Sequence, residues 1–210
     1  MLWPGYGKSI ISLSYQILEK TLGFDKTLPV VEKWSAAADF LQIISDYCLQ
    51  KKPGTIVECS SGTSTLVLSQ CCKLNQYGHV YSLENGEEFV NQTRQQLDDF
   101  SLSEYCDVFF APLKTVVLND DEFQWYDREK LPELEIDLLI IDGPPGFIQK
   151  HSRYPALPLL SKLLAKDCVV FLDDAARDDE QEMVRRWLKT YPEFQADYID
   201  NERGCYILKR

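Results

Sequence analysis

Carboxylate side chains follow several short apolar runs of this chain, at points where the strands of a sheet would end. These acids are Glu58, Glu84, Asp142, Asp173 and Asp174. A carboxylate can accept hydrogen bonds from ligand hydroxyls, take up a proton as a general base, or bind a divalent cation. Because open α/β sheets place their chemistry at the carboxyl ends of the strands, we expect these acids to lie along one edge of a sheet.

A turn of small residues follows the first of these acids. The β-branched run Thr55-Ile56-Val57 predicts a strand that leads to Glu58, and Leu66 is the next bulky side chain in what reads as a helix. Between them stand Ser60, Ser61, Gly62, Thr63 and Ser64. Such residues let backbone N–H groups approach a ligand at a helix N-terminus, although an ordinary strand-to-helix connection favours them too.

Glu84 ends a second predicted strand, the alternating run that starts at Gly78, and Asn85-Gly86 then leads into a helix. An acid at the end of the strand that follows such a loop is placed to accept hydrogen bonds from ribose hydroxyls. The loop and Glu84 together predict a ligand that contains a ribose.

In these two motifs the chain resembles the class I S-adenosylmethionine-dependent methyltransferases. Their first motif reads acid, any residue, small residue, any residue, Gly, which the stretch from Glu58 to Gly62 matches, and their second strand ends in an acid, as at Glu84. The chain departs from the family at Ser60, where Gly is common. A Cβ and a hydroxyl are thereby added where the methionine part of S-adenosylmethionine passes.

The resemblance implies which residues bind S-adenosylmethionine. They are Glu58, Ser60, Gly62, Ser64, Glu84, Asn85 and Asp142, and Ala111 and Pro112, past a third predicted strand, are expected to contact the adenine ring. Trp34-Ser35 is expected either to border this site or to cap the helix that begins there.

Asp142 and the pair Asp173-Asp174 follow two apolar runs that read as neighbouring parallel strands. This arrangement resembles small O-methyltransferases of the catechol and caffeoyl type, where an acid and an acid-amide pair hold a divalent metal, although here the pair is Asp-Asp. The resemblance implies a Mg²⁺ or Mn²⁺ site that lowers the pKa of a substrate hydroxyl. Without metal, Asp142 or Asp174 is left as a general base, and a third interpretation makes the pair a cap of the helix that begins near Asp178.

The segment between these strands carries two further polar candidates. Two motifs of this segment resemble a branch of the superfamily found in bacterial and phage genomes. They are the turn from Gly143 to Gly146 and the element Arg153-Tyr154-Pro155-Ala156-Leu157. His151 is expected near Asp142 as a general base, and Arg153 is expected to hold a substrate carboxylate or phosphate. A loop histidine that is only solvated is the alternative.

Strand and helix patterns alternate from about residue 53 to the end of the chain. They predict a three-layer, Rossmann-like α/β sandwich with a mostly parallel seven-stranded sheet, closed by a C-terminal antiparallel hairpin over 196–208. A helix is predicted over 35–49 with Ser35 as its N-cap. The acidic run 119–135 is expected to form a solvated loop and a short helix, with a substrate-binding insertion as the alternative.

Two regions are predicted along the chain. Residues 1–34 form an N-terminal arm with a helix around 9–22, which serves as a lid over the site, a contact in a homodimer, or an extra packing helix. Residues 35–210 form the S-adenosylmethionine-binding methyltransferase domain.

The net charge and the cysteines indicate which partners and which compartment to expect. A formal net charge of −11 and a pI near 4.7 argue against nucleic acids and anionic membranes as partners, because long-range repulsion opposes both. Seven cysteines, an odd number set mostly within apolar runs, predict buried thiols in a reducing cytoplasm. Neither a signal peptide nor a membrane span is expected, since polar residues interrupt the apolar positions of the N-terminus.

We therefore expect an S-adenosylmethionine-dependent methyltransferase that acts on an oxygen, or as a second choice a nitrogen, of a small metabolite or glycan. Methyl transfer relies on positioning, and a base is needed only to free the nucleophile, so no catalytic triad is required. Two alternatives are a non-catalytic module with the same fold and a nicotinamide-dependent oxidoreductase, although the latter should show a fuller glycine pattern than Ser60 to Ser64.

Overall fold

A computed structural model of the protein describes residues 4–32 and 34–210, with side chains from residue 13 onwards, so the first three residues of the predicted arm and Lys33 lie outside it. The helices are α1 (Pro4–Thr21), α2 (Ala38–Lys51), α3 (Thr63–Asn75), α4 (Glu87–Asp99), α5 (Ala156–Leu160) and α6 (Asp178–Thr190), with two 3₁₀ turns, η1 (Ser103–Tyr105) and η2 (Ser161–Leu163). The strands of the main sheet are β1 (Thr55–Cys59), β2 (His79–Glu84), β3 (Cys106–Phe110), β6 (Ile136–Ile141), β7 (Leu164–Leu172), β8 (Gln195–Ile199) and β9 (Cys205–Lys209).

The main sheet has seven strands in the order β3-β2-β1-β6-β7-β9-β8. All neighbours from β3 to β7 are parallel, and β9 runs antiparallel between β7 and β8. The predicted sheet and its closing antiparallel hairpin are confirmed. Strand order reverses between β1 and β6, and such a reversal opens a crevice for ligands outside the carboxyl ends of the strands.

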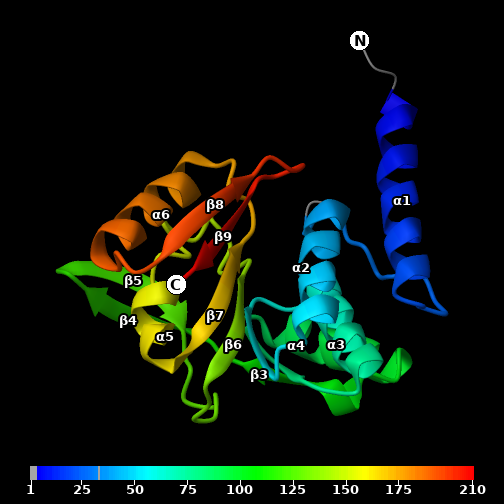
Figure 1. The fold of residues 1–210 in the computed structure, drawn as a ribbon, viewed down its shortest axis with the longest axis horizontal. Coiled ribbons are helices and arrows are strands. Elements are labelled where there is room, and N and C mark those ends of the chain that lie inside the picture. Colours follow the sequence, from blue (N-terminus) through cyan, green and yellow to red (C-terminus); the bar gives the residue numbers. More distant parts are fainter. Residues whose placement is uncertain (1–3, 33) are drawn as a thin grey trace.

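Two hydrophobic cores lie on opposite faces of the sheet, because side chains along a strand alternate between faces. One core holds Ile56, Leu138 and Ile140 with helices α1 to α4, and the other holds Val57 and Ile141 with α5 and α6. Figure 1 shows these two groups of elements on either side of the sheet. The predicted three-layer sandwich is thus confirmed, with both faces of β1 and β6 covered.

The segment 113–126 departs from the prediction. Instead of a solvated loop and a short helix, β4 (Leu113–Leu118) and β5 (Asp121–Tyr126) form an antiparallel hairpin apart from the main sheet. Phe123 and Trp125 alternate inward along β5 and are buried in the second core, while Gln124 between them is half-buried and Glu122 is exposed. The acidic residues of this stretch hide, in the sequence, the alternation of apolar and polar side chains that is typical of a strand.

Ser35 does not cap α2, whose N-cap residue is Ala37. Its hydroxyl instead accepts a hydrogen bond from the N–H of Val31 and lies 3.0 Å from the hydroxyl of Thr63, in the first turn of α3. Ser35 therefore joins the N-terminal segment to the start of the helix that follows the ligand loop.

Helix α1 packs along α2 and leads away from the body of the protein at its N-terminal end (Figure 1). The hydroxyl of Tyr15 donates to the carbonyl of Ala36 at 2.5 Å, and the amide of Gln70 donates to the carbonyl of Leu22 at 2.7 Å.

Within the described residues, no helix is both long enough and apolar enough to cross a membrane. All seven cysteines are buried and free, as predicted.

Candidate functional site

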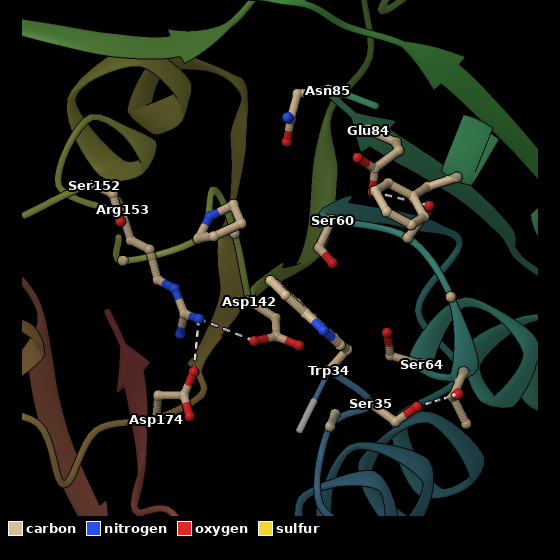
Figure 2. A pocket seen from close by; sticks show the side chains of 18 of the residues that line it. Trp34, Ser35, Ser60, Ser64, Glu84, Asn85, Asp142, Ser152, Arg153 and Asp174 are labelled. Atoms are coloured by element: carbon tan, nitrogen blue, oxygen red, sulfur yellow. Dashed lines mark hydrogen bonds and ion pairs between the residues drawn. The ribbon is translucent and has the colours of Figure 1, made fainter. Parts of the chain in front are cut away.

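One large cavity, of about 880 Å³, opens at the carboxyl ends of β1, β2, β6 and β7. Seven of the residues predicted to bind the cofactor or act in catalysis line it: Ser60, Gly62, Ser64, Glu84, Asn85, Asp142 and Asp174. Trp34, Ser35 and Arg153, which were also expected at the site, line it as well. Figure 2 shows Glu84 and Asn85 on one side of it, with Asp142, Arg153 and Asp174 on the opposite side. A volume of this size is typical of sites for small molecules and cofactors.

The ligand loop has the backbone of a glycine turn although it contains Ser60. The φ angle of Ser60 is 126° and that of Gly62 is 138°, both in a region that side chains with a Cβ rarely adopt. The N–H of Ser60 donates to the carbonyl of Leu83 at 2.9 Å, which ties the loop to β2. A Cβ added at Gly62 would meet no atom within 4 Å, so the loop faces open space where a ligand can approach its backbone.

Glu58 lies beneath this loop and is not among the residues that line the cavity. Its Oε2 accepts hydrogen bonds from Thr65 at 2.6 Å and Ser82 at 3.0 Å, and the Thr65 hydroxyl accepts one from the N–H of Gly62. Burial raises the pKa of Glu58 to about 7, against the effect of these hydroxyls. Its direct role is to hold the turn, and its contribution to cofactor binding remains a prediction.

Glu84 presents its carboxylate to the cavity from the end of β2. Oε2 accepts a hydrogen bond from Ser61 at 3.0 Å and Oε1 accepts one from the N–H of Gly86 at 2.8 Å. Burial raises its pKa above the ordinary value, while these donors act in the opposite direction. Each carboxylate oxygen can accept more than one hydrogen bond, so the group is oriented by the protein and still able to accept from a ligand.

Ala111 and Pro112 are not placed at this cavity. Ala111 is fully buried, and its N–H donates to the carbonyl of Glu84 at 2.8 Å. Pro112 lines a separate hollow with Phe110 and residues of the 127–130 segment. Their contact with adenine remains a prediction, and the geometry does not support it.

The three aspartates at the ends of β6 and β7 lie together, with one oxygen of each within 4.8 Å of the others. Arg153, only 3% exposed, lies among them. Its Nη2 donates to Asp142 Oδ1 at 3.1 Å and to Asp174 Oδ2 at 2.7 Å, and its Nη1 donates to the carbonyl of Asp173 at 2.8 Å. Figure 2 shows this guanidinium between the carboxylates of Asp142 and Asp174.

Burial changes the protonation of these groups. It raises the pKa of Asp142 to about 7, although the Arg153 guanidinium opposes the change, and it raises that of Asp173 well above the ordinary range. Both carboxylate oxygens of Asp173 are buried, and within the described part of the chain neither has a hydrogen-bond partner. Burial therefore favours the neutral form of Asp173, while Asp142 is poised to exchange a proton near neutrality.

Arg153 lines the cavity, as expected from the sequence, whereas His151 does not. The expectation that Arg153 binds a substrate anion is not supported, because Asp142 and Asp174 already engage its guanidinium. His151, buried and absent from the cavity lining, lies with Nε2 3.1 Å from Glu182 and Nδ1 3.4 Å from Arg186, both on α6. The geometry thus gives His151 no place beside Asp142 as a base. The pair Asp173-Asp174 does not cap α6 either, since Arg177 is its N-cap residue.

Several cavity residues were missed in the sequence. Tyr126, at the end of the unpredicted hairpin strand, is buried and lines the cavity next to Gly143. Phe147 lies with its ring centroid 6.1 Å from that of Trp34, in an edge-to-face contact at the cavity, and their exposed fractions are 76% and 65%. Arg177 was also missed. A large aromatic directly after a Gly-Pro-Pro-Gly turn is the signal that could have identified Phe147.

The family model described as a methyltransferase domain matches residues 57–175, more than half of the chain, and the chain belongs to this family. The match spans the ligand loop, Glu84, Asp142 and the Asp173-Asp174 pair. No curated protein matches the chain in sequence.

Solved structures of methyltransferases share the fold at low sequence identity. S-adenosylhomocysteine-bound PaMTH1 from Podospora anserina matches with a TM-score of 0.67 at 12% identity, over 100% of this chain and 97% of that one. TomG from Streptomyces achromogenes, an O-methyltransferase of tomaymycin synthesis solved with S-adenosylmethionine, gives 0.63 at 11%, over 100% and 91%. An O-methyltransferase from Bacillus cereus, in complex with S-adenosylhomocysteine, gives 0.64 at 14%, over 94% and 90%. The fold is that of S-adenosylmethionine-dependent methyltransferases, as the sequence predicted.

Proposed function

We propose that this protein transfers a methyl group from S-adenosylmethionine to a hydroxyl oxygen of a small molecule that carries a ring, such as a phenolic metabolite or a sugar. The observation that carries the proposal is that Glu84 and Asp142, which follow different strands, line one cavity, with Ser60 of the ligand loop between them in Figure 2. The first is suited to a ribose and the second to a proton transfer.

The cofactor side of the cavity is the side of β1 and β2. Glu84 would accept hydrogen bonds from the ribose hydroxyls, with its orientation held by Ser61 and Gly86. The open space beside Gly62 would admit the methionine part against the loop backbone. When bound, S-adenosylmethionine supplies a methyl group on a sulfonium, which is transferred by in-line displacement. The ligands of PaMTH1 and TomG support this placement by analogy of fold.

The acceptor side is the side of β6 and β7, where Asp142 is the proposed base. Figure 2 shows one of its oxygens turned to Arg153 and the other turned away from it. A pKa near 7 suits a group that takes the proton of an acceptor hydroxyl as the oxygen attacks the methyl carbon. Asp174 is engaged by two arginines, so it would orient Arg153 and Arg177 and leave proton transfer to Asp142.

Aromatic side chains at the cavity favour an acceptor with a flat face. Trp34 comes from the N-terminal segment and Phe147 from the loop after β6, and both expose most of their rings. Rings of this kind stack against planar or sugar substrates. Since Val31 and Trp34 belong to the wall, the arm 1–34 would act as a lid as well as a packing element.

The test is a methyl-transfer assay against a panel of phenols, catechols, sugars and amines, with S-adenosylhomocysteine release and product mass measured together. We expect O-methyl products, and for Asp142→Asn a loss in kcat of about 10²-fold or more with little change in S-adenosylmethionine affinity. Methylation confined to amines would contradict the oxygen acceptor. Full activity of Asp142→Asn would contradict the role of Asp142.

A further inference from the structure

Arg153 bridges the carboxylates that the sequence suggested as metal ligands. One nitrogen, Nη2, contacts Asp142 Oδ1 at 3.1 Å and Asp174 Oδ2 at 2.7 Å, so it occupies the point on which these two oxygens converge. Its Nε lies 3.9 Å from Glu180 Oε1 and its Nη1 binds the carbonyl of Asp173. The guanidinium is thus surrounded by oxygen atoms, as a divalent cation would be.

We infer that the Arg153 guanidinium takes the place of a divalent metal at this cluster, so that the protein gathers its carboxylates and transfers the methyl group without a bound metal ion. The part that concerns metal binding rests on the geometry alone, and the part that concerns turnover rests on the function proposed above. Arg153 is a positioning residue in this account, because it acts by holding Asp142 and Asp174.

A metal and Arg153 cannot share these oxygens. Mg²⁺ needs oxygen ligands at about 2.0–2.1 Å in a near-octahedral set, and two of the three carboxylates, those of Asp142 and Asp174, already accept hydrogen bonds from the guanidinium. The carboxylate of Asp173 is the one with both oxygens unpaired within the described residues, and a single carboxylate makes a weak site. Arg153 is 3% exposed and always protonated, so metal entry would leave an unpaired charge in the interior.

The chain differs from the resembled O-methyltransferases in two ways, and the charge of one change is balanced by the charge of the other. Where those enzymes have an amide next to the second acid, this chain has Asp174, which adds a negative charge. Arg153 supplies a positive charge at 2.7 Å from that carboxylate, and Arg177 supplies another at 3.0 Å from the same oxygen. Arg177 is half exposed at the entrance, so it neutralises Asp174 without filling the centre of the cluster.

Binding of Mn²⁺, followed by electron paramagnetic resonance and by thermal shift, tests the inference on the intact protein. Wild type should show no saturable Mn²⁺ binding at millimolar concentration and no rise in Tm. Arg153→Met should bind Mn²⁺ more tightly than wild type by about tenfold or more and gain Tm with Mn²⁺, because the carboxylates of Asp142 and Asp174 are freed to join that of Asp173. Arg177→Met is the matched control, and it should remain unable to bind Mn²⁺.

Arg153→Met leaves several buried acids without a cation, so a second variant that also carries Glu180→Gln removes one of them and keeps the test valid if the first does not fold. Saturable Mn²⁺ binding by wild type would overturn the inference. Methyl transfer that is lost in EDTA and restored by Mg²⁺ would overturn it as well, whereas unchanged turnover in EDTA is expected. Because Mn²⁺ binding is measured without substrate, failure of the proposed function, seen as no S-adenosylmethionine binding, is a separate result.

Discussion

Replacement of Ser60 by glycine should stabilise the protein, because the loop already has the backbone of a glycine turn. The φ angle of 126° at Ser60 places a Cβ in a conformation rarely adopted by L-residues. Hydrogen bonds made by the backbone of Ser60, from its N–H to Leu83 and from Ser82 to its carbonyl, do not depend on its side chain. Within the described part of the chain, the Ser60 hydroxyl makes no hydrogen bond that the change would remove.

The expected magnitude follows from two opposing effects. Relief of backbone strain of this kind is worth roughly 1–3 kcal/mol, and the extra freedom of glycine in the unfolded chain costs roughly 0.5–1 kcal/mol. The free energy of unfolding should rise by about 1 kcal/mol, which for a chain of this length corresponds to about 2–4 °C in Tm.

Differential scanning calorimetry and urea unfolding of wild type, Ser60→Gly and Ser60→Ala provide the assay. Ser60→Ala is the matched control, because it removes the hydroxyl and keeps the Cβ, so it should not share the gain. A Tm for Ser60→Gly equal to or below that of wild type would refute the reasoning, since it would show that the loop stores no strain at this residue.

Three further outcomes follow from the site. Gly62→Ala, at a φ of 138°, should lower the free energy of unfolding by roughly 1–3 kcal/mol in the same urea experiment, and an unchanged value would contradict the strain argument. Glu58 has its pKa raised from 4.5 to about 7, so the folded state keeps a proton that the unfolded state has lost; this contribution to stability is complete below pH 4.5 and disappears as the pH rises to 7. The free energy of unfolding of Glu58→Gln, relative to that of wild type, should therefore rise by roughly 3 kcal/mol between pH 4.5 and 8, measured by urea unfolding across that range. Parallel pH profiles of the two proteins would contradict the raised pKa of Glu58. Trp34→Ala should raise the KM for the acceptor by about tenfold and leave S-adenosylmethionine affinity unchanged. A change in S-adenosylmethionine affinity alone would show that Trp34 contacts the cofactor and not the acceptor.

The parallel sheet and the acids at its edge were predictable from the sequence, because their cause is local. An apolar run with an acid at its end identifies both a buried strand and the edge at which it stops, so Glu84, Asp142 and Asp174 could be placed at one cavity in advance. The hairpin of β4 and β5 was not recognised, although Phe123 and Trp125 alternate correctly, because its acidic residues outweighed the alternation.

The role of Arg153 could not be predicted, because it depends on contacts between distant residues. Its partners Asp142, Asp174 and Glu180 lie in three different segments, and only the packing of those segments shows that the side chain is buried. A charged residue in a loop is usually exposed, so its sequence position suggested a substrate contact. His151 was misplaced for the same reason, since α6 covers it.

Isothermal titration calorimetry with S-adenosylmethionine and S-adenosylhomocysteine tests the central claim most directly, with NADH as a rival ligand and wild type, Glu84→Ala and Glu88→Ala compared. Glu88 is exposed on α4 and does not line the cavity, so it serves as the matched control. We expect saturable binding of S-adenosylmethionine and S-adenosylhomocysteine to wild type. The affinity should fall by about a hundredfold in a folded Glu84→Ala variant and stay unchanged in Glu88→Ala. Absence of binding of either ligand at millimolar concentration, or binding of NADH in their place, would contradict the account.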